Sequence, residues 1–115
     1  MKMAISATGN TLSASVDRLF GRCAWFLFVD SATMECEALE NKNAHADSGA
    51  GTSCAQLVLE REVEAVISGQ VGPNAYAVLK QGDVKIFIAP RDSSVREAID
   101  MCTHNELQQM EMKVF

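Results

Sequence analysis

Five stretches of the chain have the hydrophobic and polar pattern of β-strands, at 2–7, 24–29, 34–39, 63–68 and 84–88. The stretches 2–7 and 34–39 alternate apolar with polar residues, which is typical of a half-buried strand, whereas 24–29 is continuously apolar. Only the turn-like segment 30–33 separates the second stretch from the third. These two strands should therefore form an antiparallel hairpin.

Three further segments place apolar residues at helical spacing, at 52–62, 73–82 and 94–102. Pro73 stands where the first turn of a helix tolerates proline, and Gly82 stands where a helix ends. Ser94 and Glu97 have the spacing of a capping box. The strands before and after 73–82 should be parallel, because a helix joins them by a right-handed crossover.

Together these elements predict an α/β domain with a five-stranded mixed sheet of order 3-2-1-4-5 and about three flanking helices. We expect one domain over 1–105, followed by an extension over 106–115 that is docked or flexible, with a weak Leu107, Met110 and Val114 spacing. In such a sheet, ligands bind where the connections diverge, here between the first and fourth strands.

Glycine-bearing loops at 7–10, 45–51 and 68–74 are the chemical feature of this predicted crevice. Glycines let backbone N–H groups approach a ligand, and the positive N-termini of the following helices favour an anion. The candidate binding residues in these loops are Thr8, Gly9, Asn10, Gly49, Gly51, Gly69, Gly72 and Asn74. The alternative is that these glycines serve turn geometry alone.

Composition narrows the class of protein. A chain of 115 residues with 48% apolar content suits one globular domain, and no segment is long and apolar enough to predict a membrane span or a signal peptide. We therefore expect a cytoplasmic protein, and a monomer, because glutamates protect the edge of the third strand. A net charge of −5 argues against nucleic-acid binding. Four cysteines without a C-x-x-C pair indicate reduced thiols.

Enzymatic chemistry has little support in the sequence. A metal-dependent nuclease needs clustered carboxylates, but 2–7 contains no acidic residue and Asp17, Asp30 and Asp47 are scattered over different loops. The segment Gly69 to Gly72 lacks the Lys-Ser/Thr ending of a phosphate-binding loop.

Five blocks of the chain, at 1–7, 16–23, 40–51, 67–75 and 95–99, together resemble the dinitrogenase iron-molybdenum cofactor biosynthesis family. The blocks fall in the order and spacing of that family, from the first strand through the third helix. The resemblance implies a ribonuclease H-like fold and non-covalent binding of metal–sulfur clusters, often containing molybdenum, through the mobile loops.

Basic and metal-ligating residues near these loops fit such a cargo. Arg18 and Arg22 would offset the charge of an anionic sulfide cluster, unless they form surface ion pairs with Asp17 or Asp30. His45 lies in a predicted mobile loop and is a candidate ligand for copper or iron, or else a solvated loop residue.

The cysteines divide into two candidate ligands and two structural residues. Cys23 faces either a cluster or the core, with the core favoured. Cys54 lies at the start of a helix, whose dipole should lower the thiol pKa, although packing between helix and sheet is the slightly favoured alternative. Cys36 should lie on the buried face of the hairpin, and Cys102 should be structural.

Loop placement, taken with what the family resemblance implies, predicts a non-catalytic carrier or scaffold for a molybdenum-containing metal–sulfur cluster (Mo with Fe or Cu), with a cluster donor or acceptor protein as partner. The alternative is a regulatory interaction module without metal, which would bind a partner through the hairpin edge or the Met-rich tail.

Overall fold

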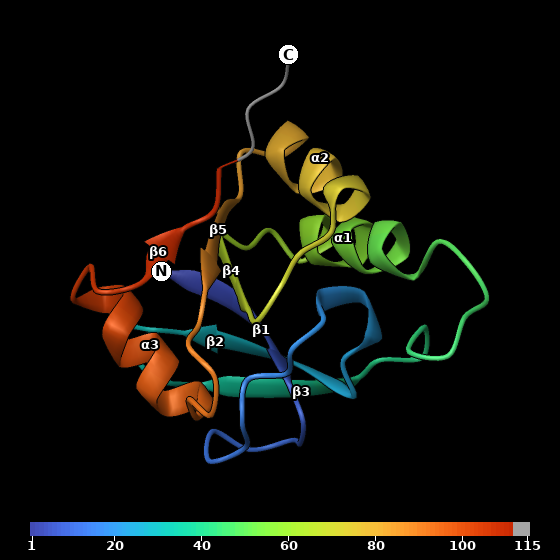
Figure 1. The fold of residues 1–115 in the computed structure, drawn as a ribbon. Coiled ribbons are helices and arrows are strands. Elements are labelled where there is room, and N and C mark those ends of the chain that lie inside the picture. Colours follow the sequence, from blue (N-terminus) through green and yellow to red (C-terminus); the bar gives the residue numbers. More distant parts are fainter. Residues whose placement is uncertain (112–115) are drawn as a thin grey trace.

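The computed structural model describes residues 1–111 and shows a mixed sheet with helices on both faces (Figure 1). The sheet order is β3-β2-β1-β4-β5-β6, so the predicted order of the first five strands is confirmed. The strands are β1 (Lys2–Ala7), β2 (Trp25–Asp30), β3 (Cys36–Glu40), β4 (Ala65–Ser68), β5 (Lys85–Ile88) and β6 (Gln108–Gln109). β1 pairs antiparallel with β2 and parallel with β4, so the direction of pairing changes at β1.

The predicted helices are present as α1 (Ala50–Glu60), α2 (Pro73–Gln81) and α3 (Val95–Thr103), together with a 3₁₀ turn, η1 (Phe20–Arg22). α1 begins two residues earlier than predicted, because Gly49 takes a left-handed φ of 74° that turns the chain into the helix. The predicted capping box of α3 is confirmed, with Ser94 and Glu97 bonding each other's backbone N–H groups. α1 and α2 lie on one face of the sheet, and α3 lies on the other (Figure 1).

Each face of the sheet has its own hydrophobic core. The core under α1 and α2 contains Phe20, Phe26, Cys54, Val66, Leu79 and Ile86. The core under α3 contains Met3, Ile5, Leu27, Ile67, Ala98 and Ile99. Successive side chains of β1 point to opposite faces, so Met3 and Ile5 enter the second core while Ala4 enters the first. Met3 is a core residue, whereas Met1 is 39% exposed.

The hairpin of β2 and β3 is confirmed, but the predicted burial of Cys36 is wrong. Cys36 is exposed, although it pairs in register with the buried Val29. β3 is an edge strand, and its side chains are exposed or half-buried throughout. Alternation showed which face Cys36 points to, but it could not show that this part of the face lies uncovered.

The C-terminal segment adds a short strand that the sequence pattern did not reveal. β6 pairs with β5, the backbone N–H of Met110 donates to the carbonyl of Ile86 at 2.7 Å, and Leu107 is buried. The weak helical spacing is replaced by extended chain because β5 offers a free edge. Val114, the last residue of that spacing, lies outside the described residues.

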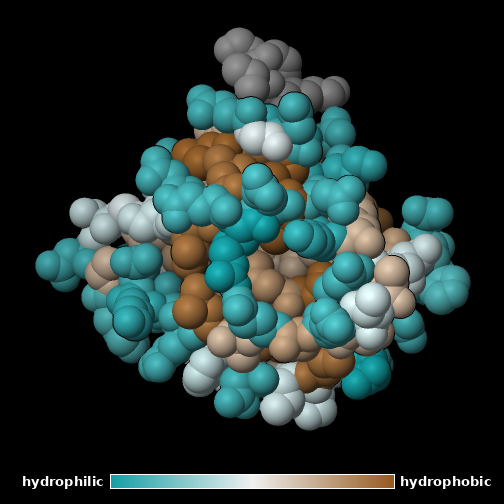
Figure 2. Space-filling model, turned by 180° about the vertical axis from the view of Figure 1, so that it is seen from behind, coloured by the Kyte–Doolittle hydropathy of each residue, from teal (hydrophilic) through white to brown (hydrophobic). Residues whose placement is uncertain are grey.

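On the face opposite to that of Figure 1, hydrophilic residues surround smaller hydrophobic areas (Figure 2). Among the helices described, none has the length and apolar character that a membrane crossing requires.

Candidate functional site

A cavity of about 290 Å³ opens where η1 meets the N-termini of α1 and α2. The residues that line it come from three segments, 19–22, 49–52 and 70–75: Leu19, Phe20, Gly21, Arg22, Gly49, Ala50, Gly51, Thr52, Gln70, Gly72, Pro73, Asn74 and Ala75. The last segment leaves the carboxyl end of β4, and the first belongs to the connection that follows β1. The cavity therefore borders the strand ends that the sequence singled out.

The wall formed by η1 is held in place by close packing. Phe20 is buried edge-to-face against Phe26, with ring centroids 5.4 Å apart, and its backbone N–H donates to the carbonyl of Gln70 at 3.0 Å. A Cβ atom on Gly21 would lie 2.7 Å from the backbone nitrogen of Gly51. Gly21 is therefore required for the contact between η1 and α1.

The helix N-termini present unpartnered donors to this cavity. Neither α1 nor α2 has a side-chain cap or an acidic residue in its first turn, in contrast to the capped α3. Within the described residues, the five lining N–H groups of the first turns of α1 and α2, those of Ala50, Gly51, Thr52, Asn74 and Ala75, have no hydrogen-bond partner. Convergent N–H groups at two positive helix ends form an environment suited to an anion.

Buried hydroxyl groups join the two connections beneath the site. Ser6 at the end of β1 donates to Ser68 at the end of β4, with 2.7 Å between the oxygens. The backbone N–H of Gly69 donates to the carbonyl of Asp17 at 3.0 Å, and a Cβ on Gly69 would lie 2.7 Å from Cα of Arg18. Close approach of two backbones thus requires Gly69.

The structure brings some of the predicted binding residues together and separates others. Arg22, Gly49, Gly51, Gly72 and Asn74 line the cavity. Gly69 and Arg18 lie next to each other outside the lining.

Thr8, Gly9 and Asn10 belong to the loop that directly follows β1, and this loop contacts the start of α3. That loop accepts hydrogen bonds from the start of α3, where Val95 and Arg96 donate to the carbonyls of Ala14 and Leu12. None of the three predicted residues is part of the lining. Their role in binding stays a prediction.

Arg22 holds the segment 41–49 against η1 by hydrogen bonds. Its guanidinium Nη1 donates to the carbonyl of Ala44 at 3.2 Å and to that of Ala46. His45, between these two residues, is exposed and outside the lining. The alternative ion pairs of Arg18 and Arg22 do not form among residues 1–111.

The carboxylates expected in those ion pairs have other partners. Asp30 pairs with the N-terminal ammonium group at 3.6 Å, and Asp17 accepts backbone N–H groups of Arg18 and Ala24. The Arg18 and Arg22 side chains are therefore not committed to these acids.

Cys23 and Cys54 are both fully buried behind η1, and each contacts the Asn41 side chain. Burial, followed by the neighbouring Cys54 and Asp17, raises the pKa of Cys23 to about 12. Burial also raises the pKa of Cys54, against smaller opposing effects from Asn41, Asn43 and Arg22. The expectation that the helix dipole lowers the pKa of Cys54 is wrong, because this residue lies beyond the first turn of α1 and inside the core.

Sequence reasoning missed three residues that shape this region: Gly21, Asn41 and Gln70. Asn41 follows β3 directly and accepts the N–H of Asn43 at 3.0 Å, an Asx turn that its position before a polar stretch could have suggested. Gly21 and Gln70 act through long-range contacts, for which no local signal exists.

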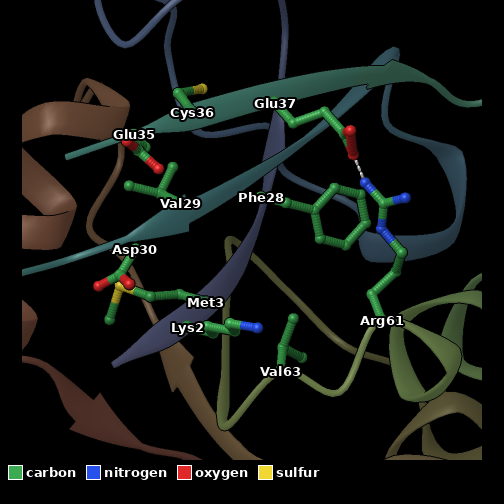
Figure 3. A pocket seen from close by; sticks show the side chains of 10 residues that line it. All are labelled: Lys2, Met3, Phe28, Val29, Asp30, Glu35, Cys36, Glu37, Arg61 and Val63. Atoms are coloured by element: carbon green, nitrogen blue, oxygen red, sulfur yellow. Dashed lines mark ion pairs between the residues drawn. The ribbon is translucent and has the colours of Figure 1, made fainter. Parts of the chain in front are cut away.

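A larger cavity, of about 610 Å³, lies at the opposite end of β1, beside the hairpin (Figure 3). Arg61 stacks over the ring of Phe28, 4.4 Å from its centroid, and pairs with Glu37. Asp30 and Glu35 add further carboxylates to this lining. The cavity carries charges of both signs and offers no convergent helix N-termini, so it is a poorer match to an anionic ligand.

Comparisons with known proteins agree with this architecture. A sequence model described as "Dinitrogenase iron-molybdenum cofactor" matches residues 1–105. An uncharacterized protein of Methanocaldococcus jannaschii is 32% identical over 114 residues, which cover 96% of this chain and 92% of that protein.

Two solved structures share the fold at similar identity. The apo form of the orange protein from Desulfovibrio gigas superposes with a TM-score of 0.90 at 30% identity, covering 95% of this chain and 92% of the other. A NifB-like protein from Thermotoga, solved by NMR, has a TM-score of 0.84 at 30% identity, with 99% and 97% covered.

Proposed function

The chain belongs to the dinitrogenase iron-molybdenum cofactor family, and we propose that it is a non-catalytic carrier or scaffold whose cargo is a molybdenum-containing metal–sulfur cluster (Mo with Fe or Cu). The cargo would be held non-covalently for cofactor assembly, storage or delivery. Family membership supports a role connected with the cofactor, and the cavity at η1, α1 and α2 supports the mode of binding.

The observation that carries this proposal is the convergence of two uncapped helix N-termini on one cavity. Sulfide and oxo groups of a cluster accept hydrogen bonds, and the five unpartnered backbone N–H groups offer donors without any acid in either first turn. Arg22 adds a cation at the rim. A dianionic cargo would gain both hydrogen bonds and charge neutralisation there.

Direct ligation of the cluster by side chains has less support than binding by the N–H groups of the cavity. Among residues 1–111, no three His, Cys, Asp or Glu side chains gather in a way that could hold a metal ion. Cys23 and Cys54 have no exposed surface, and His45 lies outside the lining. Binding would therefore be largely electrostatic, which suits a cluster that must pass between a donor and an acceptor protein.

The test is reconstitution with tetrathiomolybdate, with and without copper or iron, followed by desalting and metal analysis. Wild-type protein should retain about one molybdenum per chain with sulfide-to-metal absorption bands. Gly72→Asp would place a carboxylate at the N-cap of α2, where an added Cβ meets no atom within 4 Å. This variant should fold and cap its helix, yet lose at least about tenfold in affinity, or about 1.4 kcal/mol.

Two controls separate charge from shape. Gly72→Ala adds the Cβ without the charge, and Gln56→Glu makes the same change in charge at an exposed position of α1 outside the lining. Both should bind like wild type. Molybdenum that is absent from wild type after desalting, or retained equally by Gly72→Asp, would refute the proposal.

A second candidate function is the interaction module, and the position of β3 favours it. β3 is an edge strand of the sheet, and the 610 Å³ cavity lies beside it (Figure 3). An identified partner whose binding is lost in Ala38→Pro, on β3, but kept in Gly72→Asp would favour this function.

A further inference from the structure

Two buried thiols share one polar side chain behind the wall of the cavity. Asn41 Nδ2 lies 3.7 Å from Cys23 Sγ, and Cys54 Sγ lies 3.4 Å from Asn41 Oδ1. Both sulfurs have neighbours in η1, because Cys23 Sγ donates to the carbonyl of Phe20 at 3.2 Å and Cys54 Sγ lies 3.7 Å from that of Gly21. One amide group thus contacts two thiols that come from segments far apart in the sequence.

The donor set defines the kind of metal that such a pair can take. Thiolate sulfur is a soft ligand that selects copper(I) among common ions, whereas structural zinc requires four ligands. No third metal-ligating side chain gathers with these two in the described part of the chain. We propose that Cys23 and Cys54 form a two-coordinate site for one soft monovalent metal ion, of which copper(I) is the biological example.

The charge balance of this site is simple. Two S–H bonds break, two sulfur–metal bonds form, two protons leave to solvent, and the oxidation state of the metal does not change. The complex of two thiolates with one monovalent ion carries one net negative charge. The neighbouring Arg22 favours the thiolate of Cys54. Without metal, burial raises the pKa of both thiols, and the neighbouring Cys54 and Asp17 raise that of Cys23 further, so both are protonated near neutral pH. Metal uptake should therefore strengthen with rising pH.

Access to the pair requires local opening of the segment 41–49. Both sulfurs are fully buried, whereas Lys42, His45 and residues 47–49 of this segment are exposed. Arg22 holds the segment by hydrogen bonds to the carbonyls of Ala44 and Ala46. The Asn41 side chain holds its start by donating to the carbonyl of Cys23 at 2.8 Å. Gly21 contacts both Cys54 and Gly51, so it links the two thiols to the cavity.

This site goes beyond the proposed function, since it does not require the cavity to hold a cluster. It is tested with copper(I) alone, under anaerobic conditions, by competition against a chromophoric copper(I) chelator. Wild-type protein should remove one copper(I) per chain from the chelator. X-ray absorption at the copper edge should then count two sulfur ligands, a measurement on wild-type protein that no folding defect can affect.

Single cysteine variants identify the ligands. Cys23→Ala and Cys54→Ala should each weaken binding by more than ~100-fold, since loss of an outer partner of a metal ligand already costs ~10–100-fold. Cys36→Ala and Cys102→Ala are matched controls and should bind like wild type, with circular dichroism reporting on the fold of all four. No copper(I) uptake by wild type, three or more sulfur ligands, or loss of binding in Cys36→Ala would overturn the assignment. Failure of molybdenum binding with copper(I) uptake intact would reject the proposed function alone.

Discussion

Asn41 joins η1, β3 and α1 through one side chain, and its removal should destabilise the whole domain. The side chain is 6% exposed and donates to the carbonyls of Cys23 at 2.8 Å and Gly21 at 3.2 Å. It also accepts from the N–H of Asn43 at 3.0 Å and from the thiol of Cys54. Asn41→Ala removes all of these hydrogen bonds, because the alanine side chain has neither a donor nor an acceptor.

The size of the effect follows from the number of buried groups that lose a partner. Each unsatisfied buried group costs about 1–3 kcal/mol, and water entering from the turn at 42–49 relieves part of this cost, so we expect a loss of about 2–4 kcal/mol. For a chain of this length, about 1 kcal/mol corresponds to about 4 °C, so Tm should fall by about 8–16 °C.

The assay is urea unfolding together with differential scanning calorimetry. The matched control is Asn10→Ala, because Asn10 is exposed and its side chain has no hydrogen bond among the described residues. This control should stay within about 0.5 kcal/mol of wild type. An Asn41→Ala variant that loses less than about 1 kcal/mol, or that unfolds like the control, would refute the network as a source of stability.

Three further predictions use other features of the site. Gly69→Ala should be strongly destabilising, because its Cβ would meet the backbone of Arg18 at 2.7 Å. Gly72→Ala should leave the stability unchanged, because no atom lies within 4 Å of its Cβ. Equal urea midpoints for the two variants would contradict this. The pKa of Cys23 is raised from 9.0 to about 12, so the folded state favours the protonated thiol. The contribution of this thiol to the free energy of unfolding is therefore full below pH 9 and is lost as pH rises toward 12. Between pH 8 and 10.5 wild type should lose about 2 kcal/mol more than Cys23→Ala in urea unfolding, and parallel pH profiles would contradict it. Finally, a thiol reagent should label the exposed Cys36 within its mixing time, and the buried Cys23, Cys54 and Cys102 far more slowly. Peptide mass spectrometry would measure this, and labelling of a buried thiol as fast as that of Cys36 would be the contrary result.

The signals that specify these helices and strands lie within short stretches of the chain, which is why they could be predicted from the sequence. Alternation over β1, the apolar run of β2, the capping box at Ser94 and the Pro73 and Gly82 boundaries of α2 each depend on residues close in the chain. β6 escaped prediction because two glutamines become a strand only when β5 offers them an edge.

The candidate site was predicted only in part. Glycines before helices indicated an anion-binding arrangement, and Arg22, Gly49, Gly51, Gly72 and Asn74 do line one cavity. That Thr8, Gly9 and Asn10 are not part of the lining could not be foreseen, because the loop 8–15 is positioned by hydrogen bonds to α3, which lies far along the chain. The burial of Cys54 and the exposure of Cys36 likewise depend on which elements cover each face.

The sequence by itself determined the order and type of the elements, the class of the fold and the family, because periodicity, caps and turn residues act over a few positions at a time. The tertiary structure decided which glycines share a cavity, which thiols meet across Asn41 and which helix ends stay uncapped. These features arise from contacts between distant segments, such as Gly21 against Gly51 and Gly69 against Arg18, where two backbones can approach only because no Cβ stands between them.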